Sequence, residues 1–468
     1  MPLLQPSSRF SIRVRALGLV LAVSIVLLVS PAAAQVAGAP PTAGSAGAPA
    51  TGAPAGAKNE IAVFSIPVRF SGYTQADWVV FRQSSQDEVN AATGLPLNED
   101  RFILNAARLR ANVDHGLVTG VAEIDANTLN GMQVRPIDAE VSLRWPAREV
   151  KPGEAYFSAT IGLFRSPFGF DTQEVAQRRP FLARSSFSEA LFPGSYDLGL
   201  ALRGGYRFFN YSLGIMNGDP IAERAFPGRD PNQSKDLLFR VGVESNRDSH
   251  LRVEAGFSGL TGAGLHKGTP ATKDVFVWRD FNEDGVVDPT EIQVIAGAPA
   301  TPSERFTRFA IGADLRLSAD IPVLGELMVR GEIVRAKNLD RGLQAADPVV
   351  VGRDLREVGY YVDIVQEVTP YAMIGARYDR YNPDSDANEQ SGVRLVARDP
   401  SSSTVSVMVA ARYYKGTTPR GAGAARAIYP ARCIVQYDHR TNALGRAASG
   451  APTTLADDSL TVRGEVTF

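Results

Sequence analysis

The sequence predicts an all-β fold, a transmembrane antiparallel β-barrel of about 16 strands. The chain opens with an export signal, and its apolar and charged residues alternate along segments of about ten residues. Short turns and long loops join these segments in alternation. Barrels of bacterial outer membranes combine these features, because each strand turns one face to lipid and the other to a wet interior.

Residues 1–34 are expected to form a cleaved signal peptide. Three arginines and no acids precede the apolar run Ala16–Val29, and small residues follow it in "SPAAAQ". Because a helix needs about 20 apolar residues to span a bilayer, this shorter run favours cleavage after Ala34 over a membrane anchor. Residues 35–58 are nearly all Ala, Gly, Pro, Ser and Thr, which predicts a flexible segment. Residues 59–468 would form the barrel.

Charge and cysteine content narrow the class of protein. Removal of the three leader arginines leaves 46 basic residues against 50 acidic ones. This mild acidity argues against a nucleic-acid partner. The single cysteine, Cys433, excludes an internal disulfide bond in an exported chain.

Two-residue alternation defines the strands. In the last eleven residues, "DSLTVRGEVTF", the apolar Leu460, Val462 and Val466 oppose Arg463 and Glu465. The same count along the chain gives strands near residues 66–82, 101–113, 117–127, 133–147, 155–164, 196–204, 206–216, 236–245, 249–258, 305–318, 324–336, 355–366, 369–382, 403–414, 428–438 and 458–468. Residues 392–399 are assigned to a loop, because a seventeenth strand would break the even number expected of such barrels.

Aromatic residues mark the ends of the predicted strands. Such girdles lie at the two interfaces of the outer-membrane lipids, and here they would comprise Trp78, Phe81, Trp145, Tyr156, Phe157, Tyr360, Tyr361, Tyr413 and Tyr414. The terminal Phe468 follows an alternating strand, a signature that the barrel-assembly machinery reads. Both features place the protein in the outer membrane of a Gram-negative-type bacterium.

The predicted inward faces carry charges of both signs. Ten arginines and twelve acids belong to this set: Arg108, Arg110, Arg144, Arg240, Arg252, Arg308, Arg316, Arg330, Arg377, Arg463, Glu123, Asp125, Asp138, Glu140, Glu244, Glu254, Asp314, Glu326, Glu332, Asp363, Asp379 and Glu465. We expect most of them to pair across neighbouring strands, which would keep the wall rigid and wet.

The region 66–215 resembles the phosphate-selective porin family, which includes polyphosphate-selective porins. The similar segments are "SGYTQ" in the first strand, "RFILNAARLRANV" in the second, "GLFRSPFGF" and the stretch from "RRPFLARSSF" to "IMNGD". The resemblance implies a third loop folded into the pore, a homotrimer and an anion preference. The chain departs from the family at Ser195, Tyr196 and Asp197, where members often carry a basic residue after Pro-Gly.

The third loop supplies the candidate constriction. Arg165, Arg178, Arg179 and Arg184 lie on or beside it, and the inward-facing Arg108 and Arg110 lie two residues apart in the second strand. Planar guanidinium groups suit phosphate or carboxylate. Alternatively, the loop arginines form salt bridges to wall acids such as Glu140 or Asp138.

A calcium-loop pattern occurs in the long extracellular loop predicted at residues 259–304. The stretch "DFNEDGVVDPTE" matches the twelve-residue pattern with Gly285 at the sharp turn. The oxygen ligands would be Asp280, Asn282, Asp284, the carbonyl of Val286, Asp288 and Glu291. Since strand-like "KDVFVW" precedes it and Pro289 interrupts it, a paired-helix sensor is not expected. We predict a structural calcium site; the alternative is an acidic surface turn without a metal.

These observations predict a porin for the passive diffusion of small hydrophilic solutes, without catalysis. The four histidines, His115, His250, His266 and His439, form no recognisable nucleophile-and-base arrangement with serine. Two alternatives remain at this stage: a secreted calcium-binding β protein without channel activity and, less favoured, a barrel enzyme.

Overall fold

The computed structural model describes residues 60–63, 66–81, 89–95, 97, 100–129, 131–146, 156–219, 233–245, 250–391, 393–413, 429–446 and 452–468. The predicted signal peptide and residues 35–58 lie outside the described residues.

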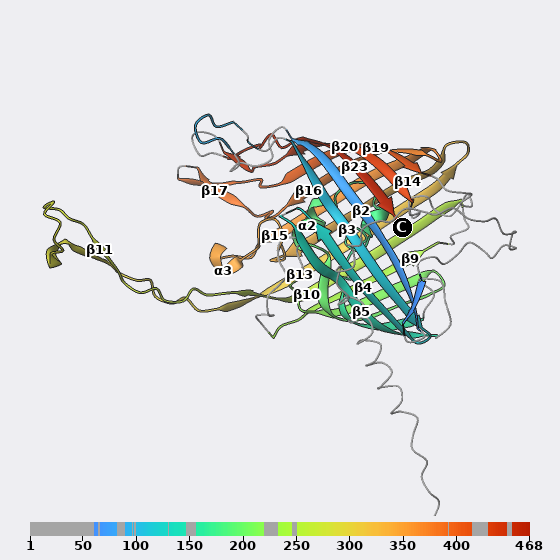
Figure 1. Cartoon of the computed structure of the whole chain (residues 1–468), viewed down its shortest axis with the longest axis horizontal. Helices are drawn as coiled ribbons and strands as arrows, with labels where there is room; N and C mark the ends of the chain where they lie inside the picture. The colour runs from blue at the N-terminus through green and yellow to red at the C-terminus, as the bar shows by residue number, and fades with distance from the viewer. Residues whose placement is uncertain are drawn as a thin grey trace, which may run out of the picture.

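Sixteen antiparallel strands close into a barrel, as the alternation predicts (Figure 1). They are β2 (Ile66–Phe81), β3 (Asp100–His115), β4 (Val118–Asn127), β5 (Gln133–Trp145), β6 (Phe157–Arg165), β7 (Tyr196–Tyr206), β8 (Phe209–Met216), β9 (Asp236–Glu244), β10 (Leu251–His266), β13 (Glu304–Ile321), β14 (Gly325–Lys337), β15 (Arg356–Thr369), β16 (Ala372–Asn382), β19 (Ser402–Tyr413), β20 (Ala431–Thr441) and β23 (Ser459–Thr467). Each strand pairs with the next one along the chain, and β23 pairs back onto β2.

The seam between β2 and β23 depends on a close backbone approach. Gly72 and Phe468 exchange two backbone hydrogen bonds of 2.9 and 3.0 Å. A Cβ atom at Gly72 would lie 2.4 Å from the Arg108 carbonyl and 2.6 Å from the Phe468 ring. Only glycine therefore fits here, where the ring of the last residue covers the first barrel strand.

Smaller elements are not part of the ring of barrel strands. β1 (Glu60–Val63) pairs with the start of β2. Three hairpins, β11–β12 (Val275–Trp278 and Ile292–Ile295), β17–β18 (Asn388–Ser391 and Arg394–Ala397) and β21–β22 (Gly445–Arg446 and Pro452–Thr453), belong to long connections. Residues 392–399 thus contain a short strand, although not a barrel strand. The helical turns are η1 (Ala176–Arg178), α2 (Ser186–Leu191), η2 (Pro289–Glu291) and α3 (Pro348–Val351).

One predicted boundary is wrong by eight residues. β10 was expected to end at residue 258, and it continues to His266, paired throughout with β13. The extension "GLTGAGLH" is built largely from small residues, so its alternation is faint in the sequence. The long connection after β10 therefore starts at residue 267 rather than 259.

The outer wall is apolar and the inner wall is polar. Along β13, exposed Phe309, Ile311 and Leu315 alternate with buried Asp314 and Arg316. Such a surface is stable only against lipid, so the barrel spans the outer membrane. No helix among the described residues is long and apolar enough to cross a membrane.

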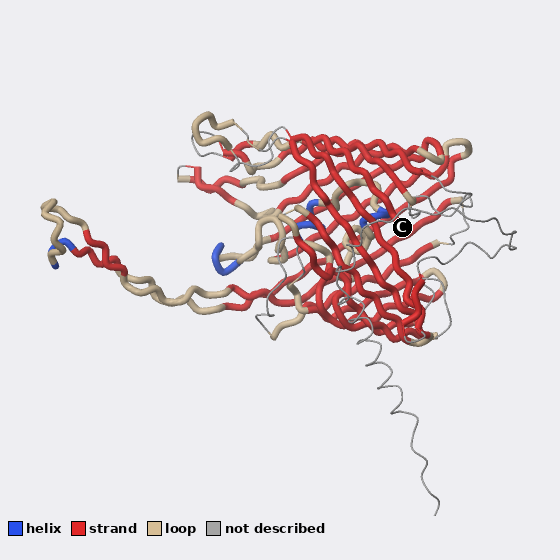
Figure 2. The backbone as a smooth tube through the Cα atoms, viewed as in Figure 1, coloured by secondary structure: helices blue, strands red, loops and turns tan. Residues whose placement is uncertain are grey.

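Most of the predicted girdle residues with described side chains lie at the outer surface, including Trp78, Trp145 and Tyr413. Tyr361 is an exception: it is buried inside the barrel, because neighbours in a strand point to opposite faces and Tyr360 takes the outward position. Tyr414 lies outside the described residues. The short turns and the C-terminus lie at one end of the barrel, and the long connections that carry β11–β12, β17–β18 and α3 lie at the other (Figures 1 and 2). We take the end with long connections as extracellular.

Candidate pore constriction

The third extracellular connection, residues 166–195, folds into the barrel, and we call it the inward loop. Wall side chains hold its backbone at several points. The Asp379 carboxylate accepts a 2.7 Å hydrogen bond from Ser186 N–H, and Gln436 Oε1 accepts one of 3.0 Å from Leu182 N–H. On β23, Arg463 donates to the Leu182 carbonyl at 3.1 Å. The inward loop thus crosses the lumen from β16 to β20 and β23.

One side of the inward loop is packed against the wall. Phe168, Phe187 and Phe192 are fully buried among inward side chains of β7–β10 and β13–β16, such as Leu260 and Val334. Phe187 stacks on Tyr361, with ring centroids 6.1 Å apart. We call this region the closed side of the lumen.

A wall glycine makes room for this packing. A Cβ atom at Gly359, on β15, would lie 2.4 Å from the Cβ of Phe187. The missing side chain lets the loop helix α2 approach the strand backbone closely, which explains why glycine stands in the middle of this strand.

Buried ion pairs join the loop to the same wall. Arg330 donates to Asp363 at 2.7 Å and to Glu174 of the inward loop at 2.5 Å. Arg377 also pairs with Asp363, at 3.3 Å, and donates to the Ala183 carbonyl at 3.0 Å. These groups are almost completely buried, so each charge depends on its partner for solvation.

The other side of the inward loop faces a polar cavity of about 260 Å³. The loop forms one of its walls, and inward residues of β2, β3, β4, β20 and β23 form the other; we call this region the open side. A second polar cavity, of about 250 Å³, shares Ala183, Arg184, Glu189, Asp438 and Arg440 with it. Since the second cavity also touches Asn442 and Asp457 beyond the end of β20, the two cavities describe one passage toward the extracellular side.

Arginines outnumber carboxylates around the first cavity. Six arginines and four carboxylates line it: Arg108, Arg165, Arg179, Arg184, Arg440, Arg463, Asp77, Asp125, Glu189 and Asp438. The wall arginines are paired with wall acids, for example Arg463 with Asp77 at 2.7 Å and Arg108 with Asp125 at 3.3 Å. Pairing across neighbouring strands therefore neutralises the wall, as the sequence predicts.

Three arginines at or within the inward loop, which we call the loop arginines, are bound differently: Arg165 is the last residue of β6, and Arg179 and Arg184 lie within the loop. Arg165 donates to the Tyr196 hydroxyl and the Gln173 carbonyl. Arg179 donates to the Glu174 carbonyl, and Arg184 to the carbonyls of Ser188 and Phe192 and the hydroxyl of Ser195. Within the described residues, none of these three guanidinium groups has an ion pair with a carboxylate. Their positive charge is therefore left to act on the passage.

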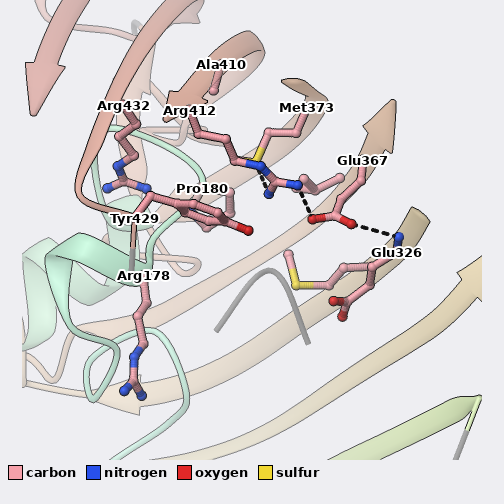
Figure 3. A pocket seen from close by; sticks show the side chains of 11 residues that line it. Arg178, Pro180, Glu326, Glu367, Met373, Ala410, Arg412, Tyr429 and Arg432 are labelled. Carbon is pink, nitrogen blue, oxygen red and sulfur yellow. Dashed lines mark hydrogen bonds and ion pairs between the residues drawn. The ribbon is translucent and has the colours of Figure 1, made fainter. Parts of the chain in front are cut away.

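The other two arginines singled out in the sequence lie elsewhere. Arg178 lines a small cavity of about 30 Å³ near the turn between β15 and β16, at the periplasmic end (Figure 3). Its guanidinium points away from the ion pair of Arg412 and Glu367 (Figure 3). Arg110 pairs with Glu123 at 2.7 Å and Asp138 at 2.9 Å on the wall. Arg178 and Arg179 are thus sequence neighbours on opposite surfaces of the inward loop.

Arg440 was missed as a site residue, although it lines both cavities. The predicted strand ended at residue 438, whereas β20 continues to Thr441. Polar residues at every second position, Gln436, Asp438 and Arg440, indicate in the sequence that the strand continues and that Arg440 faces inward.

The calcium-loop pattern forms the turn between β11 and β12. Glu291 is buried and accepts hydrogen bonds from Phe281 N–H (3.1 Å), Asn282 N–H (3.3 Å) and the Trp278 indole (3.1 Å). Asp280 accepts from Gly285 N–H at 2.8 Å. Among the described residues, no group of three or more His, Cys, Asp or Glu side chains has an arrangement that could hold a metal ion. These carboxylates close the turn by binding backbone donors.

The remaining pattern residues, Asn282, Asp284, Val286 and Asp288, are exposed on this turn. Asp284 accepts from Val286 N–H at 2.7 Å, and Asn282 donates to Asp284 at 3.0 Å. Each carboxylate and amide oxygen has two lone pairs, so oxygens already bound to N–H groups retain acceptor capacity.

Two histidines pair with aspartates at the extracellular end. His266 Nδ1 lies 2.6 Å from Asp347, and His439 Nδ1 lies 3.0 Å from Asp458. In the described part of the chain, no serine hydroxyl is hydrogen-bonded to an imidazole, so no nucleophile-and-base pair is assembled there.

Comparison with solved structures identifies the class of fold. The chain is similar to the outer membrane channel DcaP of Acinetobacter baumannii, with 8% identity, a TM-score of 0.51, and coverage of 86% of this chain and 97% of DcaP. It is also similar to OmpT, an outer membrane protein of Vibrio cholerae in trimer form (9% identity, 86% and 99% coverage, TM-score 0.48), and to the anion-selective porin from Comamonas acidovorans (11%, 86% and 99%, 0.45).

No protein-family model and no curated protein matches the sequence. The similarity to DcaP at this identity concerns the fold. Together, the closed barrel, the apolar belt and the inward loop define a porin-type barrel of the outer membrane.

Proposed function

We propose that this protein is a passive channel for small hydrophilic solutes with a weak preference for anions. The observation that carries the proposal is the open side, a water-accessible polar passage between the inward loop and the wall. A charged lining at the narrowest part of a pore sets ion selectivity. Here the three loop arginines without carboxylate partners supply the excess charge.

The preferred solutes are small anions of the phosphate or carboxylate type. Guanidinium groups bind such oxyanions through paired N–H donors. The resemblance of residues 66–215 to the phosphate-selective porins supports this chemistry and also leads us to propose a homotrimer. Cross-linking of the protein in native outer membranes tests the assembly, and a monomer there would contradict it.

Reversal potentials in planar bilayers test the selectivity. Arg179→Ala with Arg184→Ala is expected to lower the chloride-to-potassium permeability ratio several-fold, because two of the six cavity arginines are lost. Arg178→Ala is the matched control: it removes the same side chain from the same loop but outside the cavity, so it should leave the ratio unchanged. An unaltered ratio in the double variant would contradict the proposal.

We also propose that calcium binds the turn at residues 280–291 as a structural ion by drawing together carboxylates that in this structure bind backbone N–H groups instead. Six oxygen donors on one twelve-residue turn suit this hard cation. Limited proteolysis of the purified protein tests this site. The rate of cleavage between residues 279 and 292 is measured once with calcium and once with a chelator. Calcium should protect the wild-type turn and not Glu291→Gln; equal cleavage of the wild type in both conditions would contradict the site.

A further inference from the structure

Hydroxyl side chains line one wall of the open side. Ser402, Thr404 and Ser406 occupy alternate positions of β19 and line the second polar cavity. Alternate residues of a strand lie about 6.7 Å apart on one face, so their hydroxyls form a row along the passage. On β23, Ser459 and Thr461 line the first polar cavity in the same way. We call these five side chains the hydroxyl wall.

Strand β20 lies between the two rows and joins them. Asp438 stands opposite Ser406 on one side and opposite Ser459 on the other. Its carboxylate accepts hydrogen bonds from the Ser406 hydroxyl at 2.5 Å and from the Gln436 amide at 2.8 Å. The hydroxyl wall is therefore one continuous polar surface that borders both cavities.

Most of the hydroxyl wall is available to a solute. In the described part of the chain, the hydroxyls of Ser402, Thr404 and Thr461 make no hydrogen bond with another side chain, and all three border a cavity. A hydroxyl group can donate one hydrogen bond and accept two. These side chains can therefore exchange hydrogen bonds with the hydroxyl groups of a passing molecule.

The hydroxyls are confined to the part of β19 that borders the passage. Toward the periplasmic end of the same strand, the inward positions carry Met408 and Ala410, which pack in an apolar cluster with Phe181 of the inward loop. On the opposite wall of the open side, the inward side chains are charged and paired, as with Arg108 and Asp125. The passage thus has one wall of ion pairs and one wall of neutral hydrogen-bonding groups.

Arg184 of the inward loop borders both cavities beside the hydroxyl wall. Its Nη1 group donates to the carbonyls of Ser188 and Phe192 and to the hydroxyl of Ser195. Its Nε and Nη2 groups make no hydrogen bond within the described residues. These two groups form one edge of the planar guanidinium, and such an edge binds a carboxylate through two parallel hydrogen bonds.

The geometry points to a solute that has both a carboxylate and several hydroxyl groups. We propose that the passage favours hydroxylated carboxylates of the sugar-acid type, with the carboxylate at the free edge of Arg184 and the hydroxyls along the hydroxyl wall. This inference rests on the proposed channel function and narrows its class of solute. A singly charged head group suits the site because Glu189 and Asp438 also border both cavities and oppose a second negative charge. Donors and acceptors that line a pore select among solutes in this way.

Block of the ion current in planar bilayers tests the solute class with full-length protein. Gluconate is the probe. Hexanoate has the same length and carboxylate without the hydroxyls, and sorbitol has the hydroxyls without the charge. Gluconate should interrupt the current at a several-fold lower concentration than either comparison solute. Equal block by gluconate and hexanoate would overturn the proposal, as would equal block by gluconate and sorbitol.

Removal of hydroxyls tests the assignment to the wall. Ser402→Ala with Thr404→Val should raise the blocking concentration of gluconate several-fold and leave that of hexanoate unchanged. The control is Ser142→Ala with Thr160→Val, because these two hydroxyls bond each other at 2.8 Å and line neither polar cavity. The control should change neither concentration. An unchanged concentration for gluconate in the first variant, with its conductance in potassium chloride intact, would overturn the assignment.

The chloride-to-potassium permeability ratio tests the proposed anion preference separately. An anion-selective channel that responds equally to gluconate and hexanoate would overturn the sugar-acid proposal and leave the anion preference standing. A channel without anion preference that still distinguishes gluconate from hexanoate, and loses the distinction in Ser402→Ala with Thr404→Val, would contradict the anion preference and support the hydroxyl wall as the selective surface.

Discussion

The closed and open sides of the lumen are built from the same kind of strand and differ in what the inward loop places against them. On the closed side, phenylalanines of the loop cover the wall, and inward residues such as Leu260 and Tyr361 become core. On the open side, the loop presents arginines across a cavity, and inward residues such as Asp77 and Asp125 stay in contact with water.

The difference shows that strand alternation decides only which residues face inward. Whether an inward residue serves as core or as pore lining depends on the loop. The closed side should therefore respond to substitution as a protein core does, through stability, and the open side should respond through ion selectivity.

Loss of loop packing should have the largest effect. Phe187→Ala removes a fully buried ring, and such changes cost about 3–5 kcal/mol of unfolding free energy. With its anchor weakened, the inward loop should move and single-channel conductance should rise and fluctuate. Heat-dependent gel migration and bilayer recordings measure the two effects. Leu315→Ala, on the lipid-facing surface, is the control that should change neither.

Overpacking the same contact should have an intermediate effect. Gly359→Val places side-chain atoms against Phe187, and overpacking of this kind costs about 1–3 kcal/mol. The unfolding midpoint in denaturant should fall. At Gly464, on β23, a Cβ atom meets nothing within 4 Å, so Gly464→Ala should leave the midpoint unchanged. Gly464 lies on the lipid-facing side of β23, so equal sensitivity of the two glycines would contradict the tight packing of the inward loop against Gly359.

A charge change on the open side should alter ion selectivity. Asp77 accepts two 2.7 Å hydrogen bonds from Arg463 beside the cavity. Asp77→Asn removes one of the four carboxylates, so the chloride-to-potassium permeability ratio should rise, opposite to the effect of removing loop arginines. Asp114→Asn, at the turn between β3 and β4, should leave the ratio as it is. A fall in the ratio with Asp77→Asn would count against the electrostatic account.

Local patterns in the sequence predict the barrel well, because each strand repeats one simple requirement, an apolar residue at every second position. The patterns predict less where small residues make the alternation faint, as at the end of β10. They also predict less where two residues of the same type are neighbours in the chain and face different surfaces. Tyr360 and Tyr361 divide between lipid and core, and Arg178 and Arg179 divide between two surfaces of the inward loop.

The path of the inward loop could not be predicted from these patterns. It is fixed by contacts between residues far apart in the chain, such as Ser186 with Asp379 and Leu182 with Gln436. The turn at residues 280–291 shows the same limit: its pattern is local and visible, whereas its position at the end of a long arm depends on the pairing of β11 with β12.

The central claim is that solutes pass only on the open side, and thiol modification during current recording tests it most directly. With Cys433 replaced by Ser, Asn105→Cys places a thiol on the open side and Ser258→Cys places one on the closed side. A charged thiol reagent should reduce the current by about half or more at position 105 by adding a bulky charge in the passage, and should leave the current unchanged at position 258. Block at position 258, or no block at position 105, would contradict the account.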